Sequence, residues 1–287
     1  MSAIYKNKQA KIDLMNLYDQ KLQSLQIAYK NIDVNTKFGN TRVVQAGNNN
    51  GKKIVLFHGY NAGAPLTLEA VIGLMDTYCF YAIETVGQAT KSDETTINIK
   101  DDSFALWADE VLDGLQISSA NFIGISYGAF ILQKLITYKP YKVASCIFVV
   151  PSGIVSGNIW ESITKLTLPF MRYKITKSDT HLRSFIKAFV PEDDTFMMKM
   201  LTLIMKGVKL DTRIPKLLKK KDISHFNSPV YIIAAKNDVY FPGEKIKKRS
   251  TELFNNIQEV HLLNDSKHMP SKETFKYIQR KIKEWIQ

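Results

Sequence analysis

Residues 119–135 read SANFIGISYGAFILQKL, and they join an apolar run to a helical pattern through the pentapeptide GISYG. The pentapeptide fits the pattern G-x-S-x-G, in which a serine occupies a sharp turn between a strand and a helix. This turn strains the backbone at Ser126, and Gly124 and Gly128 remove side chains that would collide with the neighbouring strand and helix. The helix behind the serine offers backbone N–H groups to a developing negative charge. The stretch therefore predicts a nucleophilic serine at the end of a buried strand.

Outside this stretch, near-continuous apolar runs alternate with helical patterns. The runs are KKIVLFHG (52–59), YCFYAIETV (78–86), ANFIGIS (120–126), VASCIFVVPS (143–152), PVYIIAAKND (229–238) and QEVHLLND (258–265). Helices are expected at about 2–26, 65–76, 101–116, 127–138, 243–254 and 271–286, and a hairpin at 27–47 turns at KFGN. Such alternation predicts an α/β fold with a mainly parallel central sheet and helices on both faces.

One long interval, residues 154–225, breaks the alternation. Its segments 158–175, 180–190 and 195–208 all have helical patterns, and the strand pattern resumes afterwards. We therefore expect one core, formed by residues 1–153 and 226–287, with a helical cap inserted at 154–225.

Composition limits the class of protein. The chain has 287 residues, of which 45% are hydrophobic, so it can bury a large core. Cys79 and Cys146 lie within apolar runs and imply no disulfide framework, so the cytoplasm is the expected compartment. No secretory signal or membrane-spanning stretch is evident. The net charge of +12 comes mainly from scattered lysines, and KLLKKKD (216–222) and KIKKRS (245–250) lack interleaved aromatic residues, so nucleic acid is not an expected partner.

A serine nucleophile needs a histidine base and an acid that orients it. His268 follows the last predicted strand and Asp238 ends the strand before it, so both should lie at the same sheet edge as Ser126. Asp265 is the competing acid, but it would have to fold back sharply to reach an imidazole three residues away. His58 precedes Gly59 after an early strand and is expected to belong to a different part of the site. Structural or solvent-facing roles are expected for the other three histidines, His181, His225 and His261.

The glycine-containing loop FHGYNAGAP (57–65) can supply part of an oxyanion hole. The expected donors are the backbone N–H groups of Tyr60 and Tyr127, with Asn61 as an alternative to Tyr60. No cluster of residues has the spacing of a metal site, and no metal or organic cofactor is expected.

With these motifs in this order, the chain resembles the α/β-hydrolase superfamily, and bacterial carboxylesterases in particular. The resemblance covers the hairpin, LFHGYNAG, GISYG, the inserted cap, NDVYFP and SKHMP. It assigns Ser126 as nucleophile, Asp238 as acid, His268 as base, and Tyr60 with Tyr127 as oxyanion positions. After the 78–83 run many relatives carry an acidic residue and G-x-G-x-S, whereas this chain reads ETVGQATKS, with Glu84 and Gly87 but Ser92 one position late.

The resemblance implies hydrolysis of a small or medium acyl ester. In that family a cap normally lies over the serine, so Met200 and Ile204 on the helix at 195–208 are expected to line the substrate pocket. Thioesterase, amidase, C–C hydrolase, acyltransferase and haloperoxidase chemistry use the same framework. A ligand receptor that keeps the fold without turnover, and a basic protein that binds nucleic acid or a membrane surface, are the alternatives from other classes.

Overall fold

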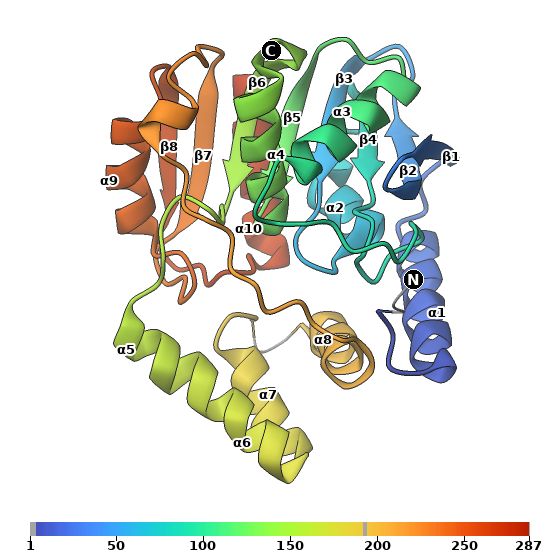
Figure 1. Cartoon of the computed structure of the whole chain (residues 1–287), viewed down its shortest axis with the longest axis vertical. Coiled ribbons are helices and arrows are strands. Elements are labelled where there is room, and N and C mark those ends of the chain that lie inside the picture. The colour runs from blue at the N-terminus through green and yellow to red at the C-terminus, as the bar shows by residue number, and fades with distance from the viewer. Residues whose placement is uncertain (1–3, 192–193, 287) are drawn as a thin grey trace.

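The computed structural model of the chain describes residues 4–191 and 194–286, and its centre is a twisted sheet of eight strands (Figure 1). The strands are β1 (Tyr29–Thr36), β2 (Gly39–Gly47), β3 (Lys52–Phe57), β4 (Tyr78–Ile83), β5 (Ala120–Ile125), β6 (Val143–Val149), β7 (Val230–Ala235) and β8 (Ile257–Leu263). Their order across the sheet is β1-β2-β4-β3-β5-β6-β7-β8. The β1–β2 hairpin pairs antiparallel with β4, and all strands from β4 to β8 in this order are parallel. The predicted α/β architecture is confirmed.

Helices cover both faces of the sheet because its central strands are apolar on both faces. Val55 and Phe57 of β3 belong to the core under α3 (Ser103–Gly114), α4 (Tyr127–Tyr138) and α9 (Gly243–Leu253). Ile54 and Leu56 point to the other face, under α2 (Gly63–Ala70) and α10 (Lys272–Trp285). Short 3₁₀ turns complete the connections at η1 (Ile72–Leu74), η2 (Pro140–Lys142) and η4 (Lys220–Asp222).

The interval after β6 forms a helical insertion that lies beyond the edge at which the parallel strands end (Figure 1). It contains α5 (Ile159–Glu161), the π-helical turn η3 (Ser162–Thr167), α6 (Leu168–Thr176), α7 (Asp179–Lys187) and α8 (Thr195–Gly207). The first three run on as one helix, and the π-turn ends two residues before Pro169, which has no N–H to donate to the preceding turn. Residues 209–219 then return to the core without helical structure.

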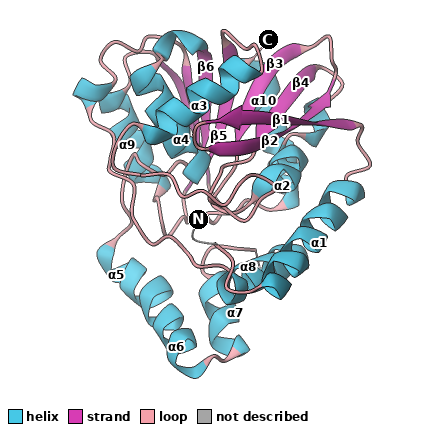
Figure 2. Ribbon diagram, turned by 45° about the vertical axis from the view of Figure 1, so that its right-hand side comes forward, coloured by secondary structure: helices cyan, strands magenta, loops and turns pink. Residues whose placement is uncertain are grey.

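The N-terminal helix α1 (Lys8–Ser24) packs against both α8 of the insertion and α2 of the core (Figure 2). Tyr5 forms an isolated antiparallel bridge with Val208, and the N–H of Lys6 donates to the carbonyl of Gly207. Leu14 and Leu17 of α1 are buried in the same apolar cluster as Met200. The N-terminal segment therefore joins the insertion to the core.

Among the helices of the described residues, none has the length and apolarity to cross a bilayer. Cys79 and Cys146 are buried free thiols.

Candidate active site

Ser126 lies at the turn between β5 and α4, with a backbone φ of 51° that L-residues rarely adopt. The two glycines around it are required by close backbone contacts. A Cβ on Gly124 would lie 2.7 Å from the Cα of Ala129, and a Cβ on Gly128 would lie 2.0 Å from the carbonyl oxygen of Phe57. The strained turn is thus held between a helix and a neighbouring strand, and it presents the serine at the sheet edge.

Ser126, His268 and Asp238 form one hydrogen-bonded line at that edge. The Oγ of Ser126 is 2.9 Å from Nε2 of His268, and Nδ1 of His268 is 2.7 Å from Oδ2 of Asp238. Oδ1 of Asp238 accepts hydrogen bonds from the backbone N–H groups of Tyr240 (2.8 Å) and Phe241 (3.0 Å). The Asp238 side chain is 0% exposed and that of His268 is 12% exposed. An Nδ1–H that donates to the carboxylate leaves Nε2 free to accept the serine proton.

The remaining candidates lie elsewhere. Asp265 is exposed, and the structure brings Asp238, not Asp265, to the imidazole. His261 lies beside Glu259 and Tyr277 on β8 and α10, His181 contacts Thr176 in the insertion, and His225 is exposed.

The loop after β3 approaches Ser126 closely enough that a Cβ on Gly59 would lie 3.6 Å from the serine Cβ. The N–H of Asn61 in this loop is already used, because it donates to Oε1 of Gln88 over 2.6 Å. Tyr127 is the first residue of α4, so its N–H has no acceptor within that helix. Of the two residues that register left open after Gly59, Asn61 is thus the one whose N–H is engaged.

His58 fixes this loop instead of taking part in proton transfer. Its Nε2 accepts from the N–H of Thr85 at 2.9 Å, and its Nδ1 is 2.6 Å from the carbonyl oxygen of Gly59, so Nδ1 carries the proton. Complete burial lowers the pKa of the His58 imidazole to about 4. The ring therefore stays neutral and ties β4 to the loop that contains Tyr60.

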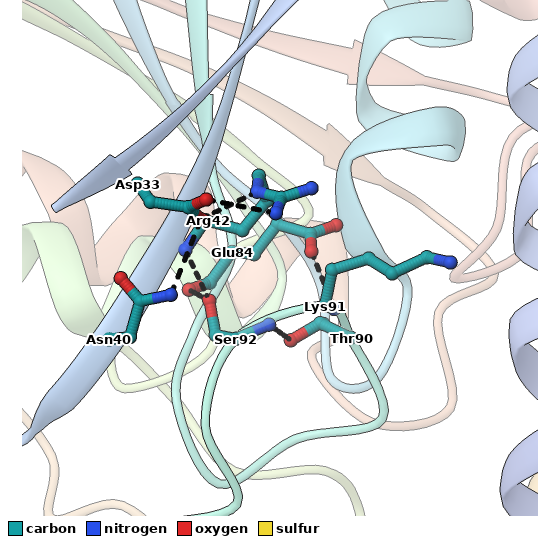
Figure 3. A network of polar contacts seen from close by, with 7 residues as sticks. All are labelled: Asp33, Asn40, Arg42, Glu84, Thr90, Lys91 and Ser92. Carbon is teal, nitrogen blue, oxygen red and sulfur yellow. Dashed lines mark hydrogen bonds and ion pairs between the residues drawn. The ribbon is translucent and has the colours of Figure 1, made fainter.

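A second loop, residues 84–92 after β4, holds the first one in place. Figure 3 shows the polar contacts that join this second loop to Arg42 of β2. Glu84 is fully buried; its Oε1 accepts from the N–H of Ala64 and its Oε2 from that of Lys91. Ser92 donates from Oγ to the carbonyl of Glu84 and accepts from the N–H of Arg42, so the late serine of ETVGQATKS connects β4 to β2. Burial raises the pKa of the Glu84 carboxyl, and three hydrogen bonds donated by Ala64, Tyr18 and Lys91 counteract that rise together with the positive charge of Arg42.

Sequence reasoning did not identify Gln88 as part of the site. Asn61 and Gln88 form a reciprocal link between the two loops, since Oδ1 of Asn61 accepts from the N–H of Ala89 at 2.8 Å. A polar residue in a loop carries no sequence signal for such a contact.

Two small cavities flank the Tyr60–Asn61 loop. One, of about 90 Å³, is bordered by Tyr60, Tyr127 and Phe104 on the core and by residues 208–211 of the return segment. The other, of about 20 Å³, lies between α1, the loop and α8, and Met200 lines it. Ile204, one turn further along α8, is buried in the apolar cluster of the insertion.

The insertion contacts the His268 loop directly. The N–H of Met269 donates to the carbonyl of Phe189, whose ring lies 5.3 Å from that of Tyr240. Tyr240 and Phe241 pack against the imidazole of His268, with ring centroids 5.2 and 5.5 Å away. The described residues include no group of histidine, cysteine and acidic side chains that could hold a metal ion.

Known proteins that are similar to this chain share its fold. The profile of a family described as alpha/beta hydrolase fold matches residues 52–274. Carboxylesterase YbfK of Bacillus subtilis is 18% identical over 278 residues, which span 92% of this chain and 90% of that protein. The crystal structure of naproxen esterase from Bacillus subtilis superposes with a TM-score of 0.83 at 16% identity, covering 98% of this chain and 100% of that one. A meta-cleavage product hydrolase from Pseudomonas fluorescens superposes with a TM-score of 0.69 at 17% identity, covering 91% and 97%.

Proposed function

The chain belongs to the α/β-hydrolase fold family, and from that premise we propose that it is a serine carboxylesterase acting on small or medium acyl esters. The observation that carries the proposal is the hydrogen-bonded line from Ser126 through His268 to Asp238 at the edge where the strands end. The names of the similar carboxylesterase YbfK and naproxen esterase support ester hydrolysis over the other chemistries of this fold.

In the proposed reaction, Oγ of Ser126 attacks the ester carbonyl while Nε2 of His268 takes the serine proton. Asp238 stabilises the imidazolium and keeps Nδ1 protonated. Collapse of the tetrahedral intermediate breaks the bond to the alcohol, which leaves with the proton from Nε2. A water molecule then attacks the acyl carbonyl while Nε2 of His268 takes its proton. Collapse of this second intermediate releases the acid, and Ser126 regains its proton from His268.

The N–H groups of Tyr60 and Tyr127 are the proposed oxyanion donors. Charge develops on the carbonyl oxygen in the transition state, and donors that are already oriented stabilise it without reorganisation. The contacts that support Tyr60 are those that fix its loop, from His58 on one side and Gln88 on the other.

We further propose that residues 154–225 act as a cap over a core of residues 1–153 and 226–287, and that substrate binds beneath it. The cavity of about 90 Å³ lies beside Tyr60 and Tyr127, the proposed oxyanion positions, and it supports the proposal that substrate binds on this side of the insertion. Met200 and Ile204 are the proposed apolar wall for longer chains, because α8 packs over the loop that carries Asn61.

The test is a panel of nitrophenyl esters and acyl thioesters of graded chain length, with Ser126→Ala as the matched blank. We expect ester turnover to fall by several orders of magnitude in the variant, because a triad acts as a unit. A pure Ser126→Ala protein that hydrolyses the esters as fast as the wild type would end the proposal. Faster turnover of thioesters than of esters would move the assignment to a thioesterase, and absence of turnover in the wild type would favour a ligand receptor.

A further inference from the structure

The helix formed by α5, η3 and α6 presents a row of large apolar side chains to solvent. Ile159, Trp160 and Ile175 are 75%, 76% and 79% exposed, and they are the most open members of the row. We call this row the outer helix face, and it consists of Ile159, Trp160, Ile163, Leu168, Met171 and Ile175. Figures 1 and 2 both place this helix along the side of the insertion that lies away from α1.

These side chains are not needed for packing within the insertion. The opposite side of the same helix supplies that contact: Leu166 and Tyr173 are buried, and the ring of Phe170 lies 5.2 Å from that of Phe185 in α7. A helix that is apolar on both sides is normally covered on both sides. A contiguous exposed apolar row of this kind marks a surface that binds something.

The charges around the outer helix face are mostly positive. Residues 159–177 include Lys165, Arg172, Lys174 and Lys177, and Glu161 is the one acidic residue in the range. Glu161 pairs with Lys165 at 3.3 Å. At the other end of the helix, partial burial and then the positive charges of Lys174 and Lys177 lower the pKa of the Lys6 ammonium group. The ammonium group of Lys174 lies 5.5 Å from the ring centroid of Phe170, at the border between the packed side and the outer helix face, and Arg172 and Lys177 are exposed nearby in the sequence. An anionic partner would neutralise these three charges.

A second copy of the chain fits this face poorly. Two identical faces would bring the lysines and arginine of residues 165–177 toward those of the other copy, and like charges across an interface are unfavourable. An apolar row with basic side chains on either side, and a tryptophan at one end, is instead the pattern of a helix that lies in the interface of a bilayer.

We propose that the outer helix face binds the surface of a bilayer that contains anionic phospholipids. The apolar row enters the boundary between headgroups and acyl chains, and Arg172, Lys174 and Lys177 contact lipid phosphates. Trp160 lies at headgroup depth, where its ring is favoured. The proposal concerns binding only and is independent of the ester chemistry.

The experiment uses the full chain with vesicles of phosphatidylcholine alone or of phosphatidylcholine mixed with phosphatidylglycerol. We expect cosedimentation with the mixed vesicles, weakened by salt, and little with phosphatidylcholine alone. Trp160 also reports insertion, because Trp107 is fully buried and Trp285 is stacked on Tyr231. Its fluorescence should shift to the blue and be quenched by brominated lipid.

Matched variants separate this face from the rest of the surface. Trp160→Ser combined with Ile175→Ser should weaken binding to mixed vesicles by about tenfold or more. Tyr141→Ser, which removes a 67% exposed ring in η2, just before β6, should leave vesicle binding unchanged.

The charge variant, Lys174→Ser with Lys177→Ser, should weaken binding by about fivefold per lysine. Its control, Lys52→Ser with Lys53→Ser at the start of β3, removes the same charge from the opposite edge of the sheet. All variants should hydrolyse a soluble nitrophenyl ester like the wild type. Absence of vesicle binding, equal loss in a control pair, or a dimer in solution that Trp160→Ser dissociates would each overturn the proposal.

Discussion

Replacement of Asp238 by asparagine tests the proposed acid at the level of single hydrogen bonds. Oδ1 of Asp238 accepts from two backbone N–H groups, those of Tyr240 and Phe241. Only an oxygen can occupy that position, so the asparagine amide must turn its NH₂ group toward Nδ1 of His268. Nδ1 then has to accept, the ring proton moves to Nε2, and the base presents an N–H to Ser126 where it needs a lone pair.

The expected loss follows from that wrong tautomer together with the lost negative charge. We expect kcat to fall by about 10⁴-fold, which corresponds to about 5 kcal/mol of transition-state stabilisation. The fold should persist, since the asparagine keeps the volume and the two backbone hydrogen bonds.

The assay compares kcat and KM for nitrophenyl acetate between Asp238→Asn and Asp265→Asn, with thermal unfolding as a control for folding. Asp265 is exposed, so its variant should keep wild-type turnover. Asp238→Asn with turnover within about tenfold of the wild type, or the reverse ranking of the two variants, would refute the assignment of Asp238.

Three further predictions concern the loops and the insertion. Gly128→Ala places a Cβ 2.0 Å from the carbonyl oxygen of Phe57, just before the Tyr60 loop, and should lower kcat/KM by about 100-fold. Gly73→Ala is the control, because its Cβ would meet only the flexible end of the Gln279 side chain, and kcat/KM should not fall. An equal loss of kcat/KM in the two variants would contradict a role for the position of the Tyr60 loop. Met200→Ala or Ile204→Ala should shift the chain-length preference on the ester panel. Turnover of the acetyl ester should stay within about tenfold of the wild type, which corresponds to about 1.4 kcal/mol. If both variants fold and keep the wild-type chain-length profile, α8 is a packing element only. The folded-state pKa of His58, about 4, lies below its unfolded value, so its contribution to stability is present above about pH 6.5 and is lost as pH falls toward 4. Denaturant titrations should therefore show the wild type losing about 3 kcal/mol more than His58→Gln between those pH values, and parallel curves would refute a buried neutral imidazole.

Local patterns were sufficient to place the line from Ser126 to Asp238. The alternation of apolar runs with helical periods fixes a parallel sheet, and the strands of such a sheet end at one edge. Residues that follow β5, β7 and β8 must therefore meet there, whatever the details of packing. The glycines of GISYG add a backbone requirement that can be read without any tertiary contact.

Contacts between segments distant in the chain could be decided only by the tertiary structure. The N–H of Asn61 is taken by Gln88, 27 residues away, and this contact supports the proposal of Tyr60 over Asn61, two neighbours that register alone left equivalent. Similarly, the helical period predicts the helix at 158–175 but not which side is covered, because both sides are apolar; α7 takes the side of Phe170 and leaves Trp160 exposed. Periodicity reports the local conformation of a segment. The acceptor that each backbone donor finds, and the element that covers each helix face, depend on which distant segments pack nearby.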